Sequence, residues 1–200
     1  MYTGIVAGTA PIVEILEGDS MRTFAVDMSG FDEDLKIGAS VSLDGVCMTV
    51  VSKENGIVAF DAISETLERT TLSERRVGDL LNVERSLRVG DELGGHILSG
   101  HIIGTSKILN REAVGDGLDL LISIPDDFSQ FVLEKGYIAI DGMSLTVGKC
   151  NEDSFYLHII PETLRITSIG SKAPGDMVNI EIDSRTQAVV ETMIRMGGES

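Results

Sequence analysis

Two segments of the sequence place a side chain that could act as a nucleophile at the same point of one pattern. Cys47 lies in LDGVCMTV and Ser144 lies in IDGMSLTV. Each follows an Asp-Gly pair with one residue between, and each precedes a threonine, Thr49 or Thr146, again with one residue between. A thiol or a hydroxyl can add transiently to a substrate when a base takes its proton. A single cysteine is more often a small buried apolar residue. Its pairing with a hydroxyl at the matching position instead favours a polar pocket that the chain contains twice.

These segments belong to a repeat that covers most of the chain. At an offset of 97 residues, VSLDGVCMTV, SETLERTTL and VGDLLNVE match IAIDGMSLTV, PETLRITSI and PGDMVNIE. At an offset of 96 residues, TGIVAGT matches SGHIIGT. Four matches in one order at nearly one spacing indicate a tandem duplication.

Two polar residues distinguish the copies. His101 stands opposite Gly4 or Ile5, and Lys135 stands opposite Gly38. A lone histidine is more often structural and an isolated lysine is normally a solvated charge. Gly100 precedes His101, however, and a glycine lets the backbone approach a ligand closely. The asymmetry makes His101 a candidate for chemistry.

The histidines give no metal motif. His96 and His101 have no Cys, Asp or Glu at ligand spacing among the surrounding glycines, so no metal site is expected. The sequence also contains no Walker loop, GxGxxG or HExxH motif, so the common kinds of nucleotide-binding and zinc site are not expected.

The repeated ETL segments begin with Glu65-Thr66 and Glu162-Thr163 at expected helix starts. Carboxylates and hydroxyls cap free amides at helix starts, and we expect that role for at least one residue of each pair. Such amides could also bind the carbonyl oxygens of a heterocycle.

Short runs of alternating apolar and polar residues predict strands in both copies, for example Ile57–Ala62, Phe155–Ile160 and Met177–Ile182. The runs lie too close together for helical crossovers, which favours antiparallel pairing and closure into barrels. Three short helices are expected, with Ser64, Asp126 and Pro161 as their start signals: Ser64–Ser73, Asp126–Glu134 and Glu162–Ser168.

The expected fold is all-β, with two six-stranded antiparallel Greek-key β-barrels in tandem and a C-terminal α-helix. Glycines near Arg88–Gly95 divide the chain into barrels over residues 1–95 and 96–183 and a helix over residues 184–200. Val189, Val190, Met193 and Ile194 form one apolar stripe on that helix. The stripe could pack on its own barrel or on other subunits.

Composition narrows the function classes. The chain of 200 residues has a formal charge of −16 and 4% aromatic residues, which disfavours binding to nucleic acid or to anionic membranes. The N-terminus does not resemble a secretory signal, and two cysteines are too few for a disulfide framework. We therefore expect a cytoplasmic location.

The motifs MYTGIV, LDGVCMTV, GGHILSGHI, IDGMSLTV and IPETL closely resemble those of riboflavin synthase of the α-chain type. The resemblance covers essentially the whole chain, with Tyr2 in place of the usual Phe. It implies a homotrimer that needs no cofactor. It also implies a dismutation in which a four-carbon unit moves between two molecules of 6,7-dimethyl-8-ribityllumazine, giving riboflavin and 5-amino-6-ribitylamino-pyrimidinedione.

In such enzymes the two substrates meet between the first barrel of one subunit and the second barrel of a neighbour. We expect His101 to assist proton transfer and Cys47, Ser40 or a water to add transiently at C7. Ser144 and Thr146 would act in the second pocket. The residues expected to bind substrate are Gly4, Ile5, Val6, Cys47, Met48, Thr49, Asp61, Ala62, Ile63, Ser64, Glu65, Thr66, Gly100, His101, Ile102, Lys135, Ser144, Leu145, Thr146, Ile160, Pro161, Glu162, Thr163, Leu164 and Arg165.

Three other functions compete with this one. A non-catalytic lumazine- or flavin-binding antenna protein would have the same fold but would lose polar residues from a pocket. A purely structural protein would not need matched polar residues beside glycines. A flavin-dependent reductase would need a nucleotide-binding domain, for which the chain has no room.

Overall fold

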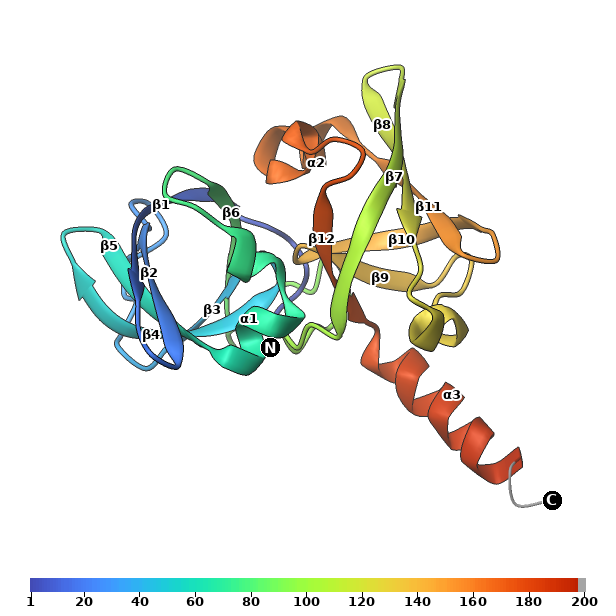
Figure 1. Ribbon diagram of the computed structural model, residues 1–200, viewed down its shortest axis with the longest axis horizontal. Coiled ribbons are helices and arrows are strands. Elements are labelled where there is room, and N and C mark those ends of the chain that lie inside the picture. Colours follow the sequence, from blue (N-terminus) through green and yellow to red (C-terminus); the bar gives the residue numbers. More distant parts are fainter. Residues whose placement is uncertain (198–200) are drawn as a thin grey trace.

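The computed structural model describes residues 1–197, apart from the side chain of residue 126, and shows two closed β-barrels followed by a helix (Figure 1). The strands of the first barrel are β1 (Gly8–Glu17), β2 (Met21–Asp27), β3 (Ser40–Leu43), β4 (Val46–Glu54), β5 (Ile57–Ile63) and β6 (Leu80–Arg85). Those of the second barrel are β7 (Gly104–Val114), β8 (Gly117–Ser123), β9 (Tyr137–Ile140), β10 (Met143–Cys150), β11 (Ser154–Ile159) and β12 (Met177–Ile182).

Both barrels have the same antiparallel strand order. The first is β1-β2-β5-β4-β3-β6, and the second, read from β7, is β7-β8-β11-β10-β9-β12. Alternate residues fill each interior, as Val58, Phe60 and Ala62 do in β5, because successive side chains of a strand point to opposite faces. The predicted all-β duplication is confirmed.

The Asp-Gly pairs form the tightest turns of the two barrels. Asp44 and Gly45 have φ of 47° and 84°, and Asp141 and Gly142 have φ of 45° and 81°, as a two-residue turn with two left-handed residues requires. The two tips press against each other. A Cβ atom on Gly45 would lie 2.7 Å from the amide nitrogen of Gly142, so a side chain there would separate the barrels.

The short helices differ in part from the prediction. The helix expected over Ser64–Ser73 is two elements, α1 (Ser64–Arg69) and η1 (Thr71–Glu74), because Thr70 between them is extended. The second repeat has the same pair, α2 (Pro161–Ile166) and η3 (Ser168–Ser171), and η2 (Asp126–Phe131) is a single 3-10 element.

The predicted capping roles are wrong. The N-cap residues of α1 and α2 are Ile63 and Ile160, which have no side-chain acceptor, so neither helix has a side-chain cap. The first-turn glutamates pair with arginines instead. Glu65 lies 3.3 Å from Arg69, and an oxygen of Glu162 lies 2.6 Å from Arg165.

A cluster of buried polar residues joins the barrels behind the hairpin tips. Asn82 donates to the backbone oxygen of Asp141 at 3.0 Å, and Asn179 donates to the backbone oxygen of Asp44 at 2.9 Å. The asparagine oxygens accept amide hydrogens of Ser168 and Thr71 at 2.8 and 2.7 Å. Each barrel therefore satisfies buried polar groups of the other.

The carboxylates of this cluster are fully buried and each faces a cation. Asp44 lies 2.7 Å from Arg75, and Asp141 lies 3.3 Å from Lys172. Burial and the nearby Asp141 carboxylate raise the pKa of Asp44 to about 6. We call Asp44, Asn82, Asp141 and Asn179 the clamp.

The helix α3 (Ser184–Gly197) follows β12 and extends away from both barrels (Figure 1). Val190 packs against the core of the second barrel, whereas Val189, Met193 and Ile194 are 64%, 67% and 51% exposed. Residues 198–200 of the predicted helical segment lie outside the described part of the chain. Over residues 1–197, none of the helices has the length and apolarity of a membrane span.

We predict that Asn179→Ala lowers the free energy of unfolding by about 2–4 kcal/mol, because it leaves the Thr71 amide and the Asp44 carbonyl buried without partners. Chemical denaturation measures this value. Asn110→Ala, on the exposed hairpin side of β7, is the matched control and should change it by less than about 0.5 kcal/mol. Equal effects of the two variants would show that the clamp does not stabilise the fold.

Candidate active site

The first candidate site is a cavity of about 440 Å³ at the mouth of the first barrel. Its walls come from the start of β4, from α1, and from residues 100–103, which arrive from the second half of the sequence. The residues that line it are Val46, Cys47, Glu65, Thr66, Arg69, Thr70, Gly100, His101, Ile102, Ile103 and Phe128.

Cys47 is held by both halves of the chain. Its amide donates to the carbonyl oxygen of Gly100 at 3.0 Å, and its sulfur accepts the hydroxyl of Tyr2 at 3.1 Å. A Cβ atom on Gly100, whose φ is +81°, would lie 2.5 Å from the Cβ atom of Cys47. Only glycine therefore allows this backbone to pack so closely against Cys47. Burial raises the pKa of Tyr2 far above its usual range, and its hydroxyl also contacts Ser40.

The second candidate site repeats this arrangement around Ser144. The amide of Ser144 donates to the carbonyl oxygen of Gly4 at 2.8 Å, and a Cβ atom on Gly4 would lie 2.5 Å from that of Ser144. The Nδ1 atom of His96 lies 2.6 Å from the hydroxyl of Ser144. Cys47 and Ser144 thus occupy equivalent positions in space as well as in sequence.

His96 is the residue of the second site that the sequence did not assign. His96 is 7% exposed, and its ring stacks on that of Tyr137 with ring centroids 5.0 Å apart. Burial lowers its pKa, which favours the neutral imidazole. Within residues 1–197, its Nε2 atom is buried without a hydrogen-bond partner. The Gly94-Gly95 pair that precedes it was the available signal, because Gly95 packs against Ser144.

Each site includes a backbone segment that comes from the other barrel. Tyr2 pairs with Leu98 in an isolated antiparallel bridge. Beyond this crossing, Val6 packs into the core of the second barrel and Ile102 packs against the core of the first. We call residues 99–102 the histidine strap and residues 3–6 the N-terminal strap. The histidine strap brings His101 to the site of Cys47, although His101 lies in the second half of the sequence.

The remaining residues that the sequence placed in the pockets fall into three groups. The side chains of Val6, Met48 and Ala62 are buried in barrel cores, and the half-buried side chains of Leu145 and Leu164 pack against the core of the second barrel. Asp61 accepts the Thr23 hydroxyl at 2.6 Å in a separate groove on the outer face of the first barrel. The exposed members are Ile5, Thr49, Ile63, Ser64, Glu65, Thr146, Ile160, Pro161, Glu162 and Arg165, and Thr66 and Thr163 are half-buried.

Lys135 occupies an unusual backbone position. Its φ is +66°, and its twin Gly38 has φ of +84° in the same turn. The amides of both residues donate to the equivalent carbonyls of Val147 and Val50, at 2.9 and 2.8 Å. The left-handed conformation of this turn favours glycine over lysine, and the side chain of Lys135 is exposed.

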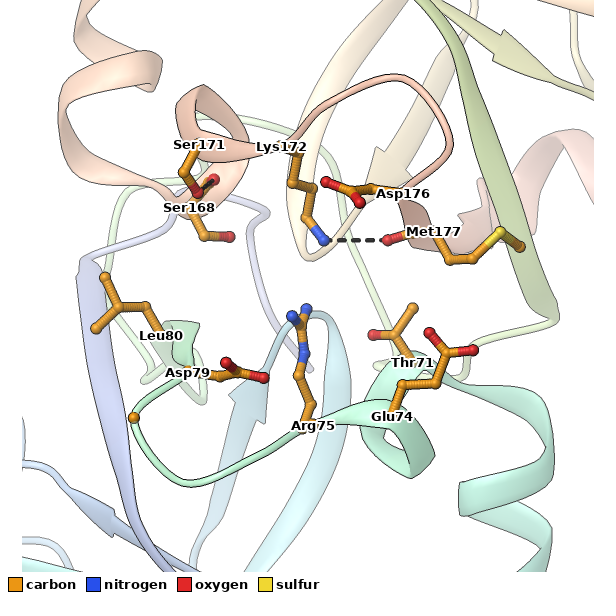
Figure 2. A pocket seen from close by; sticks show the side chains of 11 residues that line it. Thr71, Glu74, Arg75, Asp79, Leu80, Ser168, Ser171, Lys172, Asp176 and Met177 are labelled. Carbon is orange, nitrogen blue, oxygen red and sulfur yellow. Dashed lines mark hydrogen bonds between the residues drawn. The ribbon is translucent and has the colours of Figure 1, made fainter.

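A separate cavity, of about 380 Å³, lies between the barrels. Figure 2 shows Arg75 and Lys172 pointing into it from opposite sides. Both cations are already paired with Asp44 and Asp141, and Lys172 also donates to the carbonyl oxygen of Met177 at 3.0 Å. None of the site residues expected from the sequence lines this cavity, and its two cations are the partners of the clamp carboxylates. In the described part of the chain, no group of three His, Cys, Asp or Glu residues is placed to hold a metal ion.

Comparison with known proteins places these sites in a family. The lumazine binding domain family matches residues 3–86 and 99–183, one match for each barrel. Riboflavin synthase of Escherichia coli (strain K12) is 43% identical over 198 residues, which is 98% of this chain and 93% of that protein. Riboflavin synthase of Chlamydia pneumoniae is 44% identical over 201 residues, covering 98% of this chain and 96% of that protein.

Solved structures agree with the sequence relatives. LumP complexed with riboflavin superposes with a TM-score of 0.85 at 28% identity, covering 92% of this chain and 100% of that chain. LumP complexed with 6,7-dimethyl-8-(1'-D-ribityl) lumazine gives a TM-score of 0.82 at 28% identity, covering 90% and 98%. With two lumazine binding domains and full-length relatives at this identity, the chain belongs to the riboflavin synthase family.

Proposed function

We propose that this protein converts two molecules of 6,7-dimethyl-8-ribityllumazine into one riboflavin and one 5-amino-6-ribitylamino-pyrimidinedione. The observation that carries the proposal is the pair of equivalent sites, in which Cys47 and Ser144 have the same backbone frame and different side chains. Support also comes from the enzymes named above and from LumP, whose complexes contain that lumazine and riboflavin.

Two similar but unequal sites suit this reaction. The two substrate molecules are identical, so one frame can bind both, but one must give the four-carbon unit and the other must accept it. Holding the two rings together replaces a random encounter with an oriented one, which can lower the barrier by several kcal/mol. The polar groups that differ between the sites then assign the two roles.

In the first site we assign proton transfer at the C7 methyl group to His101, whose exposed ring faces the cavity of Cys47. Conjugation into the ring acidifies this methyl group, so a modest base can remove its proton. Cys47, Ser40 or a water adds transiently at C7. Hydrogen-bond donors directed at the ring carbonyls stabilise the anion that forms.

In the second site we assign Ser144 and Thr146 to the other substrate, with the neutral imidazole of His96 orienting the Ser144 hydroxyl. Thr146 is exposed beside this pair on β10, where it can reach a bound ring.

We further propose a homotrimer, in which each pair of substrates meets between the first barrel of one subunit and the second barrel of a neighbour. The exposed apolar residues of α3 support this assembly, since they lack a partner within the described chain. In that arrangement the exposed Lys135 contacts the substrate of the neighbouring subunit.

The division into residues 1–95, 96–183 and 184–200 remains our proposal for the domains, with straps that cross between the barrels. We place the enzyme in the cytoplasm, which is consistent with its two free cysteines, Cys47 and Cys150.

The alternative is a lumazine- or flavin-binding protein without catalysis. The presence of Cys47, His101, Ser144 and Thr146 at open or half-buried positions favours the enzyme, because a carrier needs no proton transfer. A tight carrier would keep its bound chromophore, and its fluorescence, through gel filtration.

We predict that the purified protein, incubated with 6,7-dimethyl-8-ribityllumazine alone, forms one riboflavin for every two substrates consumed. The four-carbon transfer balances without an oxidant or a cofactor. Chromatography with absorbance detection measures both products.

His101→Ala should lower kcat about a hundredfold, because a positioned proton-transfer group contributes at least that much. An unchanged kcat in this variant would contradict the role in proton transfer that we assign to His101.

Burial of His96 predicts a pH-dependent stability. The folded pKa is lower than the ordinary value of 6.5, so below that pH the unfolded chain binds more protons than the folded protein. The contribution of His96 is present above that value and is lost as the pH falls through the folded pKa. Urea denaturation between about pH 8 and pH 5 should therefore show a smaller loss for His96→Gln than for the wild type. Parallel losses would contradict a neutral, buried ring.

We predict that deletion of residues 184–200 weakens the trimer and lowers activity together, because the neighbour completes the reaction site. Met193→Glu should have the same two effects without shortening the chain, since it puts a charge on the exposed apolar stripe. Analytical ultracentrifugation and the riboflavin assay measure them. An active monomer would contradict a site between subunits.

A further inference from the structure

We propose that Glu181, a buried carboxylate of the second barrel, is a positioning residue that fixes His101 beside Cys47 in the first site. The catalytic role of His101 in this proposal rests on the function proposed above. The hydrogen bonds that connect Glu181 to His101 do not depend on that function.

Glu181 holds three successive peptide groups of the histidine strap. One carboxylate oxygen accepts the amide and the hydroxyl of Ser99 at 2.6 and 2.7 Å, and the other accepts the amide of Gly100 at 3.0 Å. The Ser99 hydroxyl in turn accepts the amide of His101 at 3.2 Å. The backbone of residues 99–101 is thus tied to a single side chain, directly or through one hydroxyl.

This connection reaches the reacting groups of the first site. Gly100, held by Glu181 through its amide, accepts the Cys47 amide through its carbonyl. The imidazole of His101 is exposed and makes no hydrogen bond to residues 1–197, so its place over the cavity depends on the backbone that carries it. A change at Glu181 would therefore move the imidazole and the thiol relative to each other.

The first half of the chain contains the same arrangement without the histidine. Glu84 accepts the amide and hydroxyl of Thr3 at 2.6 and 2.7 Å and the amide of Gly4 at 3.0 Å. The Thr3 hydroxyl accepts the amide of Ile5, also at 3.2 Å. Ile5 takes the place of His101, so Glu84 and Thr3 are matched controls for a purely structural role.

A carboxylate suits this position better than a neutral acceptor. Glu181 is 4% exposed, and burial raises its pKa while the hydrogen bonds from the Ser99 hydroxyl and the strap amides lower it. A buried charge is costly unless its acceptor sites are filled. Glutamine would direct an amide group at one of the strap donors, because it has a single acceptor oxygen. The strap would then shift, because the NH₂ group of the glutamine and a backbone amide of the strap would both be donors facing each other.

The test compares Glu181→Gln and Ser99→Ala with Glu84→Gln and Thr3→Ala, using the steady-state rate and the ring signals of His101 in ¹H–¹³C NMR spectra, assigned with a His101→Gln sample. The first pair should shift or broaden the ring signals and lower kcat about tenfold or more, with KM changed less than about threefold. The control pair should leave the ring signals of His101 in place. Ser99→Thr should restore kcat, because threonine provides the same hydroxyl in the twin strap.

Two results would overturn the proposal. One is unchanged His101 signals in Glu181→Gln and Ser99→Ala, and the other is a Ser99→Thr variant as slow as Ser99→Ala. If Glu181→Gln does not fold, the Ser99 pair decides alone, since neither substitution removes the buried carboxylate. Failure of the wild type to form riboflavin would reject the proposed function, whereas the ring signals would still decide whether Glu181 positions His101.

Discussion

The buried clamp between the hairpin tips is the constraint on which the two sites depend. Each site combines one barrel with a strap from the other, so a small displacement at the contact of Gly45 and Gly142 would move both sites at once. Hydrogen bonds from Asn82 and Asn179 resist such a displacement because they are directional and buried. Apolar packing alone would tolerate some sliding between two smooth barrels. The Asp44–Arg75 and Asp141–Lys172 pairs each lie within one barrel, where the cation compensates the buried carboxylate of the hairpin tip.

Duplication explains how one frame can perform two tasks. The strand order, the Asp-Gly turns and the carboxylate-held straps are the same in both halves, and these are the features that set backbone positions. At the two sites, the side chains that project from this common frame differ, among them Cys47 against Ser144 and Ile5 against His101. Because the backbone hydrogen bonds of Cys47 and Ser144 do not involve these side chains, their chemistry could diverge without a change of fold.

Much of this could be predicted from the sequence, and the failures have local causes. The offset of 97 residues correctly related Cys47 to Ser144, because the turns and strands of a repeat preserve register. The offset could not show that His101 lies beside Cys47, since the crossing of the straps is a tertiary feature of the chain after Tyr2 and Leu98. His96 was missed because its burial depends on a stacking partner, Tyr137, that lies far away in sequence. Capping was predicted from residue type at helix starts that in fact follow Ile63 and Ile160.

The clamp and the straps differ in how they can fail. The clamp joins two large, separately packed cores, so its loss affects the whole molecule. A strap is a few residues long, carries an exposed side chain at its third residue, Ile5 or His101, and is tied to its own barrel mainly by one carboxylate. Its position can therefore change while the barrels remain folded, which separates the energetics of the site from those of the fold. The chain has a formal charge of −16, and the two buried glutamates that hold the straps add to the repulsion among its negative charges. Apolar residues at these positions would avoid that repulsion. That cost is understandable if each carboxylate serves to place particular backbone groups against the partner barrel, where position matters more for chemistry than for stability.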